Sequence, residues 1–179
     1  MIPRRLDGEP DRLDGEPNGS RSRPLTAGER VLLRSLFADA IDYERARVFA
    51  RKWQFFQPRH IAMAPNGHIY FPPPHHCDDF SLASLPLHTR AWFVHEGAHL
   101  YQYYGLKWNV IARGIVSRRY SYRLKPGKKL HEYGLEQMGS IAADYYVLRE
   151  GGRIRPSYCL ADFADVLPLR GADELRARA

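Results

Sequence analysis

The chain has 179 residues and a formal net charge of +7. That length is typical of one domain that buries a core of its own. Apolar residues make up 44% of the chain and aromatic residues 12%, which excludes an intrinsically disordered protein as a whole. The sequence contains no run of 18 apolar residues, so it predicts no membrane span.

The amino-terminal region carries no apolar stretch of the kind that a secretory signal peptide needs. Two cysteines, Cys77 and Cys159, are too few and too far apart to indicate a disulfide framework. Both observations favour a cytoplasmic location. Residues 5–11 are followed by a near-copy at 12–18, a repeat rich in Gly, Pro and charge. We therefore expect a disordered arm over residues 1–25 and a single domain over 26–179.

The first half of the predicted domain begins with a capping box, in which Thr26 and Glu29 precede an apolar helical pattern. This predicts a helix over about 27–40. A plausible strand follows at 46–51, and residues 60–71 read as a β-hairpin around an Asn-Gly turn.

The second half is predicted to be mainly helical. A helix over about 87–104 ends at a glycine, and a short helix is expected near 110–116. Residues 120–124 alternate like a strand, and a second strong helix begins near 133 and stops at two glycines. A last helix is expected around 160–167.

A His-Glu-x-x-His pattern lies in the middle of the chain, with His95, Glu96 and His99. Residues four apart share one face of an α-helix, so the two imidazoles can bind a single metal ion. In zinc hydrolases the Glu between them accepts a proton from the attacking water. The pattern therefore predicts a Zn²⁺ site with Glu96 as general base. Two partly buried histidines without a metal are the alternative.

A catalytic zinc needs a third protein ligand and an open position. The Gly and His that metzincins place after the second histidine are replaced here by Gln102 and Gly105. The second strong helix offers Glu136 and Asp144, which lie on similar faces. A carboxylate on a downstream helix is the gluzincin arrangement, so we expect Glu136 to be the third ligand, with a solvated helix residue as the alternative. We expect Asp144 to accept a hydrogen bond from an imidazole, and Gln102 to lie beside the ligands.

Other residues near these helices are candidates for supporting roles. The oxyanion of a hydrolytic transition state needs a donor, and the sequence does not choose among Tyr103, Tyr120, Tyr122 and His131. The run from His75 to Asp79 is dense in potential ligands, but contiguous residues rarely converge on one ion. An exposed loop is the favoured interpretation of that run.

These motifs carry a resemblance to a known family. His95-Glu96-x-x-His99-x-x-Gln102 is preceded by Gly67-x-Ile69-Tyr70-Phe71-Pro72 and Asp79-Phe80, and is followed by Tyr120-x-Tyr122-x-Leu124 and Tyr133-x-x-Glu136-Gln137. Over roughly residues 24–150 the chain resembles the bacterial vgr-related zinc metallopeptidases, found near type VI secretion spikes, Rhs toxins and related contractile injection systems. That family often has Gln-Ala where this chain has Met138-Gly139.

The resemblance implies export by a contractile secretion system and a spike or Rhs-type partner. Together with the motifs, it leads us to expect an α+β fold. This would be a minimal zincin-like domain, with a small antiparallel sheet that includes the hairpin at 60–71. The sheet would pack on the His-Glu-x-x-His helix and on a second, ligand-bearing helix.

The leading hypothesis is a gluzincin-like peptidase that binds extended peptide along Ile69–Phe71. A zinc-stabilised structural or adaptor module of a secretion apparatus is the alternative. Between Gly97 and His131 the chain has no acidic residue and eight basic ones: Lys107, Arg113, Arg118, Arg119, Arg123, Lys125, Lys128 and Lys129. This stretch predicts a preference for acidic peptides, unless the charges are solvated or paired. Nucleic acid is a weaker alternative, suggested by Tyr120 and Tyr122 among those charges.

Overall fold

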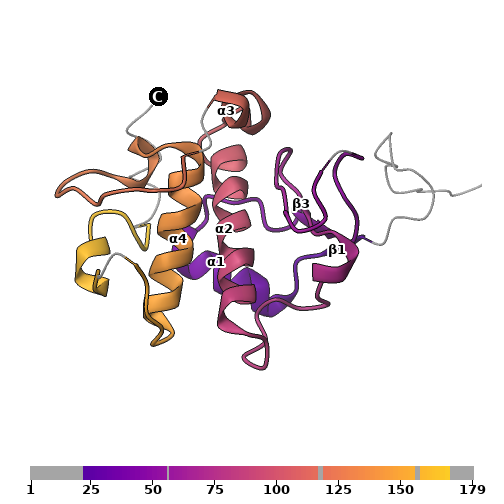
Figure 1. Cartoon of the computed structure of the whole chain (residues 1–179), viewed down its shortest axis with the longest axis horizontal. Coiled ribbons are helices and arrows are strands. Elements are labelled where there is room, and N and C mark those ends of the chain that lie inside the picture. The colour runs from indigo at the N-terminus through magenta and orange to yellow at the C-terminus, as the bar shows by residue number, and fades with distance from the viewer. Residues whose placement is uncertain (1–21, 56, 117–118, 156–157, 170–179) are drawn as a thin grey trace, which may run out of the picture.

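The structure, a computed structural model, describes residues 22–55, 57–116, 119–155 and 158–169. Within these residues it is an α+β domain with a three-stranded sheet and four α-helices. Two long helices, α2 and α4, lie side by side in the middle of the molecule, α1 crosses behind them, and the sheet lies on the other side of α2 from α4 (Figure 1). None of the described helices is long and apolar enough to cross a membrane.

The sheet has the order β1-β2-β3 and consists of β1 (Ser22–Pro24), β2 (Arg47–Phe49) and β3 (Ile69–Tyr70). Strands β1 and β2 are antiparallel, whereas β2 and β3 are parallel, so the expected antiparallel sheet is in fact mixed. Strand β1 also falls inside the segment that we expected to be disordered up to residue 25. Its backbone hydrogen bonds come from β2, a long-range partner that local composition does not reveal.

The predicted hairpin at 60–71 is present only as a single antiparallel bridge between Met63 and Tyr70. The Met63 amide donates to the Tyr70 carbonyl at 3.2 Å, and the Tyr70 amide donates to Met63 at 2.8 Å. Gly67 has a φ of 83° in the turn, a conformation that glycine adopts without steric cost. Because Met63 pairs with the outer side of β3, the segment Ile69–Phe71 is not the open edge that we expected.

Helix α1 (Ala27–Phe37) begins at the predicted capping box. Thr26 accepts from the Glu29 amide at 3.1 Å, and Glu29 accepts from the Thr26 amide at 2.9 Å. The Glu29 carboxylate is fully buried and also receives Arg23 at 2.7 Å and the Phe80 amide at 2.9 Å. It thereby joins β1, α1 and the loop before α2.

The predicted helices near the motif are confirmed as α2 (Leu87–Tyr104), α3 (Val110–Val116) and α4 (Leu135–Arg149). Gly105 follows α2 in a right-handed helical conformation, so its role is not that of a left-handed cap. Apolar residues surround most of α2, which is why this helix is buried between α4, α1 and the sheet.

Two sequence predictions in the second half were wrong. Residues 120–124 form no strand, and their polar groups are instead bound by side chains such as the Tyr158 hydroxyl, which accepts from the Leu124 amide at 3.2 Å. The expected tail helix at 160–167 is a short 3₁₀ turn, Leu160–Phe163, whose Phe163 is fully buried against the core.

Candidate metal centre

His95, His99 and Glu136 come together between α2 and α4 as a group that could hold a metal ion. The Glu136 Oε2 atom lies 3.2 Å from His95 Nε2 and 3.6 Å from His99 Nε2. The two imidazole rings are edge to face, with centroids 5.2 Å apart. Among the described residues no other cluster of three or more His, Cys, Asp or Glu side chains has this property.

The spacing of these donors suits zinc. Ligands about 2.1 Å from a tetrahedral zinc ion lie about 3.4 Å from one another. The two contacts of Glu136 bracket that value, and the potential ligand atoms of all three residues lie within 4.8 Å of one another. Two imidazole nitrogens and one carboxylate are also a donor set that leaves a fourth position for water. The three residues could therefore hold a metal ion of this kind.

Gln102 orients one ligand and ties the two helices together. Its Oε1 lies 2.8 Å from His99 Nδ1, so the Nδ1–H tautomer donates there and leaves Nε2 for a metal. Its Nε2 donates to the Leu135 carbonyl at 2.8 Å, in the turn that carries Glu136. Gln102 is fully buried, and both contacts lie inside the protein. The Gln102 side chain thus fixes the position of His99 relative to the first turn of α4.

Gly139 allows His95 to pack against the backbone of α4. A Cβ atom at position 139 would lie 2.5 Å from His95 Cε1 and 2.6 Å from Nε2, which is far inside van der Waals contact. In the sequence alone, this glycine stands out only as a departure from a family pattern. Its position one turn after Glu136, on the same helical face, was the available signal.

Glu96 lies in a different environment from the ligands. Its side chain is buried, with 4% of the residue exposed, and Oε2 has no hydrogen-bond partner among the described residues. Burial raises the pKa of Glu96, and the neighbouring His99 and His95 offset this only in part. The carboxylate is therefore held as a strong proton acceptor next to the ligands.

His99 and Glu136 strongly shift each other's pKa values. Burial alone would lower the pKa of His99, but the hydrogen bond to Glu136 and the charges of Glu96 and Glu136 outweigh it and raise this pKa to about 9. For Glu136, burial acts to raise the pKa, yet the hydrogen bonds from His95 and His99 dominate and hold it far below the ordinary range. Without a metal, the proton therefore resides on the imidazole and the carboxylate stays ionised.

Asp144 has a different partner from the imidazole that we expected. Its Oδ2 accepts from the Tyr122 hydroxyl at 2.6 Å, because the chain before α4 brings Tyr122 over this part of the helix. Burial, together with the Asp144 contact, raises the pKa of Tyr122. The Tyr122 hydroxyl is thus hydrogen-bonded to Asp144. Tyr120, in contrast, stacks on His95 at a centroid distance of 6.0 Å and is 54% exposed.

The two other candidates for binding the oxyanion are Tyr103 and His131. Tyr103 is one helical turn beyond His99, and His131 lies in the 3₁₀ turn Leu130–Glu132 that precedes α4.

The run from His75 to Asp79, all of it described by the structure, does not form a metal cluster. It is half-buried where an exposed loop was expected: His75 packs on Trp92 with centroids 5.3 Å apart, and Asp79 accepts from the Ser81 amide at 2.8 Å.

The fold and the site thus define a small α+β domain with a two-histidine, one-carboxylate group that could hold a metal. No family model matches the chain. The chain is 37% identical over 135 residues to the type VI secretion system spike protein VgrG2b of Pseudomonas aeruginosa. This match covers 70% of the chain but only 13% of the spike protein.

The structure is also similar to the solved effector domain of Pseudomonas aeruginosa VgrG2b. The TM-score is 0.68 and the identity 32%, over 86% of this chain and 89% of that domain. The chain therefore belongs to the family of the VgrG2b effector domain. The expected relationship to vgr-related type VI secretion proteins is confirmed.

Proposed function

We propose that this protein is a zinc-dependent peptidase of the gluzincin type that acts as an effector of a type VI secretion system. The donor set of His95, His99 and Glu136 supports zinc, and membership of an effector-domain family supports the secretion context. The proposed partner in delivery is a secretion spike, because a spike protein contains a homologous region. A cytoplasmic stage before export is part of the same proposal.

The observation that carries the proposal is the buried Glu96 with one oxygen lacking a partner. Leaving a buried carboxylate unsatisfied destabilises a fold by about 1–3 kcal/mol or more. A metal that served only to stabilise the domain would not need such a group. A hydrolase does need it, since a buried carboxylate with one unpartnered oxygen and a raised pKa can take up and release a proton.

The chain's own residues can divide the work of hydrolysis. Bound zinc would act as a Lewis acid on the scissile carbonyl and lower the pKa of water. Glu96 accepts the proton of the attacking water and passes it to the leaving amine. Gln102 keeps His99 in the Nδ1–H tautomer through the 2.8 Å contact. Tyr120 is the tyrosine we assign to the oxyanion, because its exposed ring stacks on the imidazole of His95.

The test compares the wild-type protein with Glu96→Gln and Glu136→Ala. We expect elemental analysis to find about one zinc per chain in wild type and in Glu96→Gln, and little in Glu136→Ala. Incubation with a broad peptide library, read by mass spectrometry, should show cleavage by wild type. Glu96→Gln should be slower by a factor of about 100 or more, because an amide accepts no proton.

Two outcomes would contradict the proposal. Wild type without a transition metal, even after refolding with zinc, removes the metal site. Zinc in both wild type and Glu96→Gln with no cleavage by either points instead to a structural metal in an adaptor module. A Glu96→Gln variant that cleaves as fast as wild type would show that this residue is not the base.

A further inference from the structure

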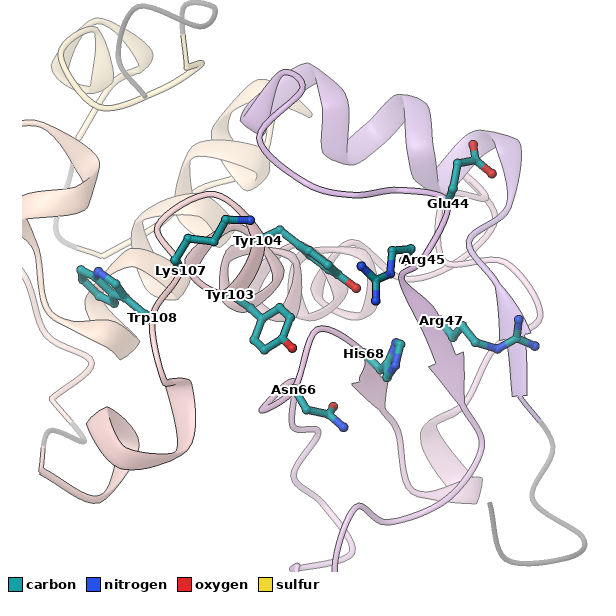
Figure 2. A pocket seen from close by; sticks show the side chains of 9 residues that line it. All are labelled: Glu44, Arg45, Arg47, Asn66, His68, Tyr103, Tyr104, Lys107 and Trp108. Atoms are coloured by element: carbon teal, nitrogen blue, oxygen red, sulfur yellow. The ribbon is translucent and has the colours of Figure 1, made fainter. Parts of the chain in front are cut away.

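A hollow lies beside the carboxyl end of α2, with a volume of about 620 Å³. This is within the range of about 300–1,000 Å³ that small-molecule sites occupy. Figure 2 shows that its side chains come from three parts of the chain: the end of α2 and the turn after it, the hairpin turn, and the region of β2. We call it the α2-end pocket. It is lined by Glu44, Arg45, Arg47, Asn66, His68, Tyr103, Tyr104, Lys107 and Trp108.

The charge of the α2-end pocket is positive. Arg45, Arg47 and Lys107 line it, against the single carboxylate of Glu44, which is itself ion-paired with Arg30. Arg47 donates to the neutral Ser22 hydroxyl at 3.2 Å. In the part of the chain that the structure describes, neither Arg45 nor Lys107 forms an ion pair with a carboxylate.

The walls of the pocket are held in place by local contacts. The Tyr104 hydroxyl donates to the Gly67 carbonyl at 3.1 Å, and Asn66 donates to the Tyr70 hydroxyl at 3.1 Å. Lys107 has a φ of 55°, an uncommon conformation for a residue with a side chain, and it lies in the sharp turn that follows α2. These contacts link the hairpin turn to α2 and leave a cationic pocket with polar and aromatic walls.

Three of the other basic residues in the acid-free stretch have aromatic or acidic partners. Lys128 lies over the Tyr133 ring at 4.1 Å, and Lys129 is 3.7 Å from Asp165. Arg113 covers the Trp108 ring at 3.9 Å, next to the pocket. The positive charge relevant to a ligand therefore comes only partly from the acid-free stretch. The rest comes from Arg45 and Arg47, far away in sequence.

The pocket lies at the carboxyl end of α2, the helix that also carries His95 and His99. Tyr103 lies four residues after His99 and on nearly the same face, about 6 Å farther along the axis. An extended peptide advances about 3.3 Å per residue, so that distance corresponds to about two residues. A peptide that runs from the metal centre toward the carboxyl end of α2 would therefore bring a neighbouring group to Tyr103, one wall of the pocket.

We propose that the α2-end pocket binds a carboxylate of the substrate, within about two residues of the scissile bond, through Arg45 and Lys107. This proposal rests on the peptidase function proposed above. The carboxylate belongs either to an acidic side chain or to a free carboxyl terminus, since both present the same planar anion to a guanidinium. Lysine or arginine at the same substrate position is disfavoured by like charge.

Binding is measured on the full chain carrying Glu96→Gln, so that no peptide is cleaved. Fluorescein-labelled alanine-glycine octapeptides with one central Asp or one central Lys are compared by anisotropy, each with a free or an amidated carboxyl terminus. We expect the preferred carboxylate to improve affinity by about tenfold at low salt and less at high salt. Loss of the preference on amidation assigns it to the terminus, whereas persistence assigns it to the Asp side chain.

The pocket variant is Arg45→Gln with Lys107→Gln, and its matched control is Arg123→Gln with Lys125→Gln. All four side chains are exposed, and both double variants remove two positive charges. We expect the pocket variant to lose the carboxylate preference and the control to keep it. Equal loss in both variants would show only a long-range effect of net charge and would overturn the proposal. So would equal affinity for all four peptides.

The proposal can fail independently of the peptidase function. A wild-type enzyme that cleaves the peptide library with no preference for a nearby carboxylate leaves the peptidase intact and removes the role of the pocket. Carboxylate-dependent binding that needs Arg45 and Lys107, in a protein that cleaves no peptide, supports the pocket and contradicts the peptidase.

Discussion

Among the described residues, two carboxylates are almost completely buried, and their surroundings differ sharply. Glu29, at the junction of β1 and α1, receives two hydrogen bonds from Arg23 and one each from the Thr26 and Phe80 amides. Glu96, in the metal centre, has an oxygen with no partner among the residues the structure describes. The two residues are 0% and 4% exposed, so burial alone does not distinguish them.

The difference in hydrogen bonding indicates what Glu29 and Glu96 each contribute to the protein. A buried carboxylate with its hydrogen-bonding capacity filled connects segments that are distant in sequence, here β1, α1 and the loop before α2. One that lacks a partner costs stability and keeps its capacity to accept a proton. Glu29 is therefore a structural carboxylate, whereas Glu96 has the properties that its proposed role as general base requires. Replacing each with its amide should have opposite effects on stability.

The largest expected effect is at the structural carboxylate. Glu29→Gln removes the negative charge opposite Arg23 and should lower the free energy of unfolding by about 3 kcal/mol, measured by urea denaturation. Glu44→Gln is the control, because Glu44 also pairs with an arginine, Arg30, but is largely exposed. The control should change stability by less than about 1 kcal/mol. Equal effects for the two variants would break the comparison.

The pH dependence of zinc binding tests the candidate metal centre. Because His99 has a pKa of about 9 in the metal-free protein, zinc binding at neutral pH must displace its proton. We expect release of about one proton at pH 7, and an apparent zinc affinity that rises about tenfold per pH unit until it levels off near pH 9. Calorimetry in buffers of different ionisation enthalpy measures the proton. An affinity that is flat between pH 7 and 8 would contradict this coupling.

The raised pKa of His99 also makes the stability of the metal-free protein depend on pH. The raised pKa of His99 stabilises the folded state fully below the ordinary histidine value of about 6.5, and this contribution is lost as the pH rises through about 9. Adding saturating zinc should remove this dependence, since the bound imidazole carries no proton at Nε2.

The smallest effect is expected from Glu96→Gln on stability. Because burial raises the pKa of Glu96, its ionised form destabilises the metal-free fold at neutral pH. The amide should therefore stabilise the metal-free protein by about 1 kcal/mol at pH 7. The gain should shrink as the pH falls toward 4, where the carboxyl becomes protonated in both states. A loss of stability at pH 7 as large as that of Glu29→Gln would show that Glu96 is a structural carboxylate after all.

Local patterns in the sequence were sufficient for much of the helical framework. The capping box at Thr26 and the apolar periodicity around His95 predicted α1 and α2, because each depends on contacts within one or two helical turns. The same spacing rule put His95 and His99 on one face. Glu136 could be predicted as the third metal ligand, because the site needed a carboxylate on a helix and the sequence offers few.

Tertiary structure decided what depends on partners that are far apart in sequence. β1 exists because β2 pairs with it, and Asp144 binds Tyr122 because of the course of the chain before α4. The approach of His95 to Gly139 and the joining of Arg45 with Lys107 in one pocket have the same origin.

The sequence by itself determined which residues could bind a metal and accept a proton, since those capacities belong to the side chains and their helical spacing. Only the fold decided which of them are buried, partnered or left unsatisfied. Those properties depend on the neighbours that packing supplies.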